Sequence, residues 1–213
     1  MRLAELLNAV EREPLFTTGM LLSPGVDVGN VRKQLSRWTK DGTVVQLRRG
    51  LYALGGLYRK TEPHPYEVSN ALVPGSYVSL ETVLAEHGLI PEAVFATTAV
   101  TTQRPGTRTT PLGAFVYQHL REELFWGYQV ENLVGGRTAF VAGPEKALLD
   151  LGYLRSRSDD PAFARELRLS RLDSLDIEQL PRMAQRFGSR KVERFARNVA
   201  ALAALEDEEY EDL

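Results

Sequence analysis

The alternation of apolar and polar positions in residues 27–41 predicts an amphipathic helix. Val31, Leu35 and Trp38 recur at i, i+4 and i+7, which places them on one side of a helix that turns about 100° per residue. The opposite side is expected to carry Lys33, Ser36, Arg37 and Lys40, flanked by Asn30, Arg32 and Gln34. The helix is therefore predicted to be apolar toward a core and basic toward solvent.

Turn-forming residues bound this helix and lead into a hairpin. Asp27 or Asn30 can cap its first turn, since a short polar side chain there accepts a bond from a free backbone N–H. Asp41-Gly42 is typical of a helix end. Residues 44–47 and 51–54 are predicted strands, with Arg48-Arg49-Gly50 as the turn between them.

Two shorter helices are expected before this stretch. Residues 2–13 place Leu3, Leu6, Leu7 and Val10 on one helical face, and residues 16–22 are predicted to form a second short apolar helix. Three helices followed by a hairpin with arginines at its tip indicate a winged helix-turn-helix that binds duplex DNA. In such a unit the helix enters the major groove, and Arg48 and Arg49 at the hairpin tip can reach phosphates or the adjacent groove. The residues of the helix expected to contact DNA are Asn30, Arg32, Lys33, Ser36, Arg37 and Lys40. The alternative is a small α+β unit with a solvated basic helix that binds protein.

The remainder of the chain mixes both element types. Gly55-Gly56 and the segment up to Pro65 indicate a junction, so we expect domains at residues 1–56 and 57–213. Helices are predicted at residues 65–72, 80–88, 144–154, 177–187 and from 190 onward, and strands at 94–102, 113–119, 127–134 and 138–141. Ser79 is the expected cap of the helix that starts at residue 80. The predicted fold class is α+β, with a larger mixed domain after the DNA-binding one.

Charge and composition narrow the possible partners. The whole chain has 213 residues and a net charge of −2, so attraction to nucleic acid has to come from local patches. Residues 1–56 contain eight Lys and Arg against five Asp and Glu, a balance of +3. The chain has no cysteine, and its amino terminus is amphipathic rather than a signal core, which favours a cytoplasmic protein. No apolar run is long enough for a membrane span.

Motifs for catalysis are missing from the sequence. Neither a phosphate-binding glycine loop nor GxSxG occurs, and His64, His87 and His119 lack metal-ligand spacing. Glu145 and Lys146 resemble part of a nuclease motif, yet they open a helix and lack an upstream acidic partner, so we interpret them as structural. We therefore predict a protein that is not an enzyme and has no catalytic residues, cofactor or metal.

The carboxyl-terminal part carries two charged features. Arg190, Arg194 and Arg197 recur at i, i+4 and i+7 on the last helix, either as a second nucleic-acid surface or as the solvated face of that helix. The final segment, residues 206–213, has six acids and is expected to be a frayed, solvated tail. In an alternative interpretation, this acidic tail binds the basic face of the helix in place of DNA.

Several segments of the sequence, taken together with their order and spacing, resemble the AbiEi family of antitoxins from type IV toxin–antitoxin and abortive-infection systems. The resemblance lies in residues 35–54, 76–92, 97–120, 125–128 and 142–154. It implies an N-terminal winged helix-turn-helix that binds inverted repeats in its own promoter as double-stranded operator DNA. It also implies a second domain that counters a nucleotidyltransferase toxin without having to touch it. DNA contacts would then fall on Lys33, Arg37 and their neighbours, and on Arg48 and Arg49.

Two other functions remain open at this point. The first is a stand-alone winged-helix transcription factor whose second domain senses a ligand, which would show a ligand-sized pocket. The second is an enzyme with a DNA-targeting unit, such as a nuclease, which would need acids clustered in space within residues 57–213.

Overall fold

The N-terminal part of the chain folds into three helical segments and a small sheet. The computed structural model describes residues 1–10, 13–23 and 25–211, with side chains up to Leu205. The first elements are α1 (Leu3–Ala9), β1 (Phe16–Thr17), the 3-10 helix η1 (Thr18–Leu21), α2 (Val28–Lys40), β2 (Val44–Arg48) and β3 (Leu51–Leu54). Their strands form an antiparallel sheet in the order β1-β3-β2. We call residues 1–54 the N-terminal unit.

The segment before α2 corrects the sequence-based prediction of a helix over residues 16–22. Phe16 and Thr17 form a strand that pairs with Tyr52 and Leu51, and only Thr18–Leu21 is helical, as one 3-10 turn. The strand forms because Phe16 is fully buried and stacks on Tyr52 across the sheet, at 5.7 Å between ring centroids. Residues 11 and 12 of the predicted first helix lie outside the described residues.

The second part of the chain surrounds a six-stranded mixed sheet, which confirms the predicted α+β class. Its helices and 3-10 helices are α3 (Pro65–Leu72), α4 (Glu81–Glu86), η2 (Glu122–Leu124), α5 (Pro144–Leu154), α6 (Pro161–Glu166), η3 (Leu172–Ser174), α7 (Leu180–Gln185) and α8 (Arg190–Glu211). Its strands are β4 (Ser76–Val78), β5 (Ala96–Thr101), β6 (Gly106–Thr110), β7 (Gly113–His119), β8 (Tyr128–Leu133) and β9 (Arg137–Ala142). The strand order is β6-β7-β5-β4-β9-β8. We call residues 65–211 the C-terminal unit.

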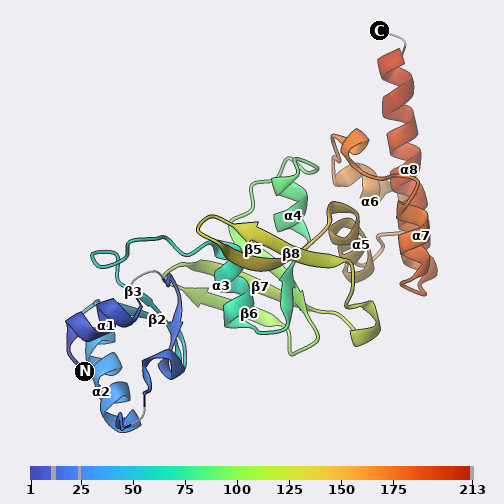
Figure 1. Cartoon of the computed structure of the whole chain (residues 1–213). Coiled ribbons are helices and arrows are strands. Elements are labelled where there is room, and N and C mark those ends of the chain that lie inside the picture. The colour runs from blue at the N-terminus through green and yellow to red at the C-terminus, as the bar shows by residue number, and fades with distance from the viewer. Residues whose placement is uncertain (11–12, 24, 212–213) are drawn as a thin grey trace.

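The molecule is elongated, with the sheet of the C-terminal unit between the N-terminal unit and the last helices (Figure 1). The largest core joins this sheet to α4, α5, α7 and α8 through residues such as Tyr77, Leu148 and Phe195. A separate core holds the N-terminal unit together around Leu35, Phe16 and Tyr52. None of the described helices is both long and apolar enough to cross a membrane.

A third apolar cluster crosses between the two units. Leu47, Leu51 and Ala53 of the β2–β3 hairpin pack with Val68 and Leu72 of α3, and with Ala99, Phe115 and Tyr117 of the sheet. One side of the hairpin is therefore buried against the C-terminal unit rather than exposed to solvent. Because buried apolar area is the main source of association free energy, this contact holds the hairpin at a defined place on the sheet.

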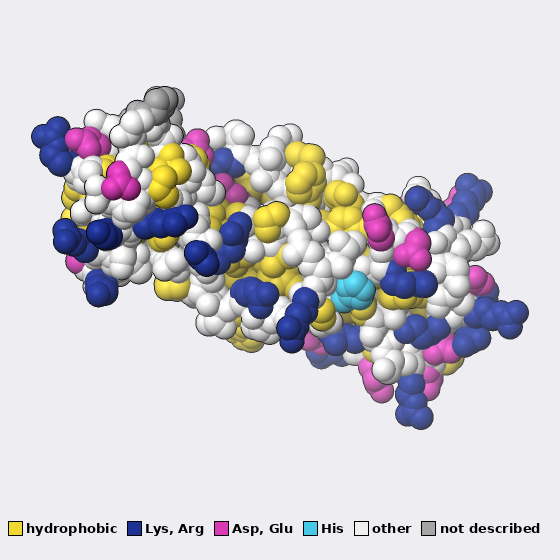
Figure 2. Space-filling model, turned by 90° about the horizontal axis from the view of Figure 1, so that it is seen from below, with side chains coloured by type: hydrophobic (Ala, Val, Ile, Leu, Met, Phe, Trp, Pro, Cys, Tyr) yellow, Lys and Arg dark blue, Asp and Glu magenta, His cyan; other side chains and the backbone are white. Residues whose placement is uncertain are grey.

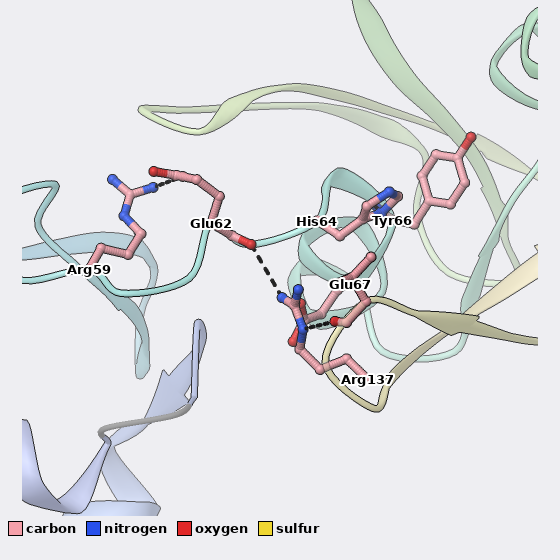
Figure 3. Close-up of polar contacts among 7 residues, drawn as sticks. Arg59, Glu62, His64, Tyr66, Glu67 and Arg137 are labelled. Carbon is pink, nitrogen blue, oxygen red and sulfur yellow. Dashed lines mark hydrogen bonds and ion pairs between the residues drawn. The ribbon is translucent and has the colours of Figure 1, made fainter.

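The connecting segment is also held to the C-terminal unit (Figure 3). Arg137, at the start of β9, donates from Nη1 to the carbonyl oxygen of Glu62 at 3.3 Å. The same nitrogen forms an ion pair with Glu67 of α3 at 2.8 Å. Arg59 pairs with the carboxylate of Glu62 within the connection itself. Since both Arg137 and Glu67 are largely buried, this pair is less screened by water than a surface one.

Several element boundaries differ from the predictions. Ser79 is no helix cap: α4 begins after Leu80, and the Ser79 hydroxyl donates to Asp150 at 2.9 Å. The strand β6 was not predicted, and the helix expected over residues 177–187 is helical only over Leu180–Gln185. The acidic segment was expected to fray, yet α8 continues to Glu211; residues 212 and 213 lie outside the described part.

Candidate nucleic-acid interface

Helix α2 turns its apolar stripe inward, as its spacing predicted. Val31, Leu35 and Trp38 are buried in the core of the N-terminal unit. The carboxylate of Asp27 accepts a hydrogen bond from the backbone N–H of Gly29 at 2.7 Å, which confirms Asp27 as the cap. Packing on one side and capping at the first turn together decide which residues of α2 face solvent.

The outward side of α2 is basic and unpaired. All six residues expected there are exposed: Asn30, Arg32, Lys33, Ser36, Arg37 and Lys40. Within the described part of the chain, none of the four cations among them takes part in an ion pair or side-chain hydrogen bond. Their charges are therefore free to attract a polyanion, and the repulsion between them falls when phosphates approach.

The two arginines at the hairpin tip, which the sequence pattern treated alike, have different surroundings. Arg48 donates from Nε to the carbonyl oxygen of Ala71 in α3 at 3.1 Å, so its side chain contacts the C-terminal unit. Arg49 is exposed, and no hydrogen bond or ion pair of its side chain occurs among the described residues. Gly50 completes the turn at φ +81°, a conformation that favours glycine, and its carbonyl accepts from Thr18 N–H.

Basic side chains continue from the N-terminal unit onto the edge of the large sheet. In Figure 2, dark-blue side chains run in a band from the N-terminal unit over the middle of the face, with little magenta between them. Two exposed cations of the C-terminal unit belong to this edge: Arg108 lies on the edge strand β6, and Arg104 precedes that strand by two residues. Arg108 lies directly opposite Phe115, so it shares the sheet face that receives the hairpin.

Sequence reasoning missed this middle part of the band. A signal was present, because three of the residues 107–110 are β-branched threonines, with Arg108 between the first two and Gly106 just before them. What the pattern did not contain is the position of β6 as the outermost strand, beside β7. Only that position puts Arg108 on the sheet face that contacts the β2–β3 hairpin, which lies about sixty residues earlier in the chain.

The second predicted basic surface, on α8, has one of its three arginines engaged in an ion pair. Arg190, Arg194 and Arg197 are all exposed on α8. Arg194 forms an ion pair with Asp159, which precedes α6, and donates to it from Nε at 3.0 Å. That pairing lowers the pKa of the Asp159 carboxyl through the hydrogen bond from Arg194. Arg194 therefore has a structural contact, which agrees better with a solvated helix face than with a dedicated phosphate site.

A buried charged cluster lies inside the C-terminal unit, away from the basic band. Lys146 and Asp150 form an ion pair one turn apart on α5, and neither side chain is exposed at all. Tyr77 accepts from Lys146 at 2.8 Å and donates to Asp150 at 2.9 Å. Burial lowers the pKa of Lys146 and raises those of Asp150 and Tyr77. Every polar atom of the pair thus has a partner, and the cluster joins α5 to β4.

Aromatic rings enclose the ammonium group of Lys146. Its Nζ lies 4.9 Å from the centroid of Trp126, 5.0 Å from that of Phe187 and 5.4 Å from that of Tyr77. Because these rings come from the segment before β8, from the segment just after α7 and from β4, one lysine contacts three distant parts of the chain. The interpretation of Lys146 as structural agrees with this environment.

An open hollow of about 500 Å³ lies at the start of β5 and β7. Tyr66, Glu86 and Phe95 are among the residues that line it, and the Tyr66 hydroxyl donates a short hydrogen bond to the Glu86 carboxylate. The Phe95 side chain at its rim is 94% exposed. In the part of the chain that the structure describes, no group of three or more His, Asp or Glu side chains is arranged to hold a metal ion.

Comparison with known protein families gives a match over the N-terminal unit. Residues 5–55 match the family described as "Transcriptional regulator, AbiEi antitoxin". This confirms the resemblance that the sequence indicated, over the segment that contains α2 and the hairpin. No curated protein matches the chain.

Proposed function

We propose that this protein is a DNA-binding autorepressor and antitoxin of a type IV toxin–antitoxin system. The observation that carries the proposal is the exposed set of cations on α2, opposite the buried stripe of Val31, Leu35 and Trp38 and without an ion pair to any described residue. It lies within the segment that matches a family of antitoxin regulators. We infer a role in binding rather than catalysis, in the cytoplasm.

The proposal identifies residues 1–56 as a winged helix-turn-helix. Its support is the order α1, η1, α2 and hairpin, together with β1 pairing on β3, which is the arrangement of a helix-turn-helix followed by a wing. In this arrangement α2 enters the major groove of double-stranded operator DNA. Lys33 and Arg37 then face the bases or flanking phosphates, and Arg49 reaches the backbone.

The basic band extends the proposed contact beyond the helix. Arg108 at the sheet edge lies on the same sheet face as the hairpin that follows α2. Exposed cations there would neutralise further phosphates, adding affinity without adding sequence information. An operator with inverted repeats would bind two copies of the protein, one on each half-site.

Salt-dependent binding tests the DNA-binding part. Fluorescence anisotropy with duplex DNA from upstream of the protein's own gene should give a log–log salt slope of roughly −0.9 per neutralised phosphate. Arg37→Ala should weaken binding and reduce the slope by about one. Glu178→Ala, which removes an exposed charge in the C-terminal unit, is the matched control. Unchanged affinity and slope for a folded Arg37→Ala variant would contradict the assignment.

Co-expression with a neighbouring nucleotidyltransferase toxin tests the antitoxin part. We assign this activity to residues 57–213, and no direct contact with the toxin is required. The full-length chain should restore growth, and so should its Arg37→Ala variant when both genes are transcribed from a foreign promoter. Loss of rescue in a folded Arg37→Ala variant would show that protection depends on DNA binding.

A second candidate function is a transcription factor that senses a small molecule, and the hollow beside Phe95 favours it by its size. Ala96 and Ala114 line this hollow, so Ala96→Trp or Ala114→Trp would fill it as a ligand does. A sensor should then change its operator affinity severalfold. Unchanged affinity in both variants would remove the support for sensing.

A further inference from the structure

Strand β8 forms one outer edge of the large sheet and has little of the protection that edge strands usually carry. It is the last strand in the sheet order, and its pairing with β9 runs from Tyr128 to Leu133 without a shift of register. It contains no proline, lysine or arginine, and its only charged residue is Glu131. The opposite edge strand, β6, carries Arg108 and directly follows Pro105. Because prolines, bulges and basic side chains keep edge strands from pairing, β8 is the more open of the two edges.

The backbone bonds of β8 show which of its residues point to the free edge. The carbonyl of Gly127 accepts from the N–H of Gly143 at 3.3 Å, and bonded pairs alternate along antiparallel strands. Phe140, opposite Val130, therefore belongs to a pair without such bonds, and its N–H bonds instead to the Asn70 side chain at 2.6 Å. The backbone groups of the even-numbered residues point away from β9: Tyr128, Val130 and Asn132. Within the described chain, no other segment bonds to them.

Apolar side chains at this edge are uncovered on one face of the sheet. Val130 and Phe140 lie directly opposite each other, so both project from the same face, with exposed fractions of 55% and 46%. The Phe140 ring meets Tyr128 edge-on at 5.9 Å, and Tyr128 stacks on the buried Tyr77 at 4.6 Å. The exposed pair is therefore continuous with the main core of the C-terminal unit.

The side chains of β8 are complementary to those of a second, antiparallel copy of the same strand. When Val130 lies opposite Val130 of the second copy, Gln129 lies opposite Glu131, and Tyr128 lies opposite Asn132. The Gln129 amide can then donate to the carboxylate of the other copy. Both valines meet on the face that already exposes apolar surface, so the pairing satisfies charge and burial together.

Neighbouring registers of the same pairing are poorer. A shift of two residues in one direction puts Glu131 opposite Glu131, and like charges directly opposite each other are destabilising. The same shift in the other direction leaves residues 131–133 of each copy beyond the end of the partner strand. The arrangement centred on Val130 leaves only Leu133 beyond it. The sequence of β8 therefore favours one register.

We infer that two copies of this protein associate through β8, about a two-fold axis at Val130, so that their sheets become one. In this register Val130 exchanges backbone bonds with Val130, and Tyr128 with Asn132, which are the residues whose groups point to the free edge. A two-fold contact between identical chains is the commonest symmetric assembly. The inference goes beyond the proposed function, because it does not depend on DNA binding.

Sedimentation equilibrium of the full-length chain measures the association. The mass should rise with concentration from the 23.8 kDa of one chain toward twice that value. Val130→Lys places two like charges opposite each other at the axis and removes two packed valines. The dissociation constant of the dimer should therefore rise about tenfold or more. Phe95→Lys, which introduces the same charge at a side chain that is 94% exposed and outside β8, is the matched control. Circular dichroism verifies that both variants fold.

Introduced cysteines test the register, since the chain has none of its own. Chains carrying Gln129→Cys are mixed with tagged chains carrying Glu131→Cys and are then oxidised. In the inferred dimer these two positions face each other with Cα atoms about 4.5 Å apart, which a disulfide can span. Like positions lie on a diagonal of roughly 7–8 Å, which is too long. Disulfides between unlike chains should form severalfold faster than those between like chains.

Each contrary result has a defined meaning. A mass that stays at one chain at every concentration would overturn the inference, and so would equal dissociation constants for the wild type and Val130→Lys. An equal rise caused by Phe95→Lys would show an unspecific contact of apolar side chains, which also overturns it. Equal crosslinking of like and unlike chains would contradict the two-fold axis at Val130. The proposed function is tested separately, by the DNA affinity of Arg37→Ala.

Discussion

Arg48 at the hairpin tip donates a hydrogen bond to the carbonyl oxygen of Ala71 in α3, with 3.1 Å between the two atoms. The contact joins residues that are 23 apart in the chain and lie on different units. Together with Leu47 and Leu51 in the shared apolar cluster, it makes the proposed wing part of an internal interface. The same hairpin therefore has one side buried against the protein's own sheet and a tip at which Arg49 is exposed.

The two hairpin arginines should consequently behave differently on substitution. Arg49→Ala should weaken operator binding and reduce the salt slope by about one, with a stability change within about 0.5 kcal/mol. Arg48→Ala should destabilise the fold by about 1 kcal/mol, because it removes the bond to Ala71. Urea denaturation and anisotropy on both variants measure these effects. Equal losses of stability in the two variants would contradict a structural role for Arg48 alone.

The isolated N-terminal unit should be less soluble than its charge suggests. A fragment of residues 1–56 exposes Leu47, Leu51 and Ala53, which the full-length chain buries in the cluster between the units. We expect the fragment to self-associate and to unfold at lower urea than the corresponding transition of the whole protein. Leu47→Lys in the fragment should restore a monomer, as measured by light scattering. A monomeric fragment without that substitution would mean that the interface contributes little.

The buried pair of Lys146 and Asp150 should be sensitive to the loss of one partner. Lys146→Met leaves the Asp150 carboxylate without its cation, so we expect a loss of about 3–5 kcal/mol in the free energy of unfolding. Asp150→Asn should also destabilise the fold, because it leaves the ammonium group unpaired. The double variant should lose less than the sum of the two, which a double-mutant cycle by urea denaturation measures. Additive losses would mean that the pair does not interact in the folded state.

Close packing of α5 on α8 gives a further prediction. A Cβ built on Gly152 would lie 2.3 Å from Cδ1 of Phe195, too close for any real contact. Gly152→Ala, which normally stabilises a helix, should here destabilise the protein by about 1–3 kcal/mol. Adding Phe195→Leu should recover part of that loss by making room for the methyl group. Thermal unfolding of the single and double variants is the measurement, and an undiminished melting temperature for Gly152→Ala would contradict the packing.

Local patterns were enough to predict much of the fold. The stripe of Val31, Leu35 and Trp38, the cap at Asp27 and the helix that opens at Pro144 depend on neighbours within a few residues, and the structure has all three. The strands predicted at residues 127–134 and 138–141 also formed as β8 and β9, and they pair across Gly135 and Gly136, whose φ angles are +83° and +75°. Helical periodicity and turn chemistry act over short distances in the chain, so a sequence contains them directly.

Contacts between distant segments decided the rest. Ser79 has the chemistry of a helix cap, but Asp150, 71 residues away, binds its hydroxyl instead. Lys146 and Asp150 have the spacing of an exposed helical ion pair, and only the packing of β4, α7 and α8 around α5 buries them.

The proposed DNA-binding surface shows the same division. The sequence alone determined that α2 is basic on its outer side, because this follows from helical periodicity. Tertiary structure decided that Arg48 bonds to α3 while Arg49 remains exposed. It also decided that Arg108 of β6 lies on the sheet face on which the hairpin packs. Those placements depend on strand order and on burial between units, and neither is encoded in the spacing of neighbouring residues.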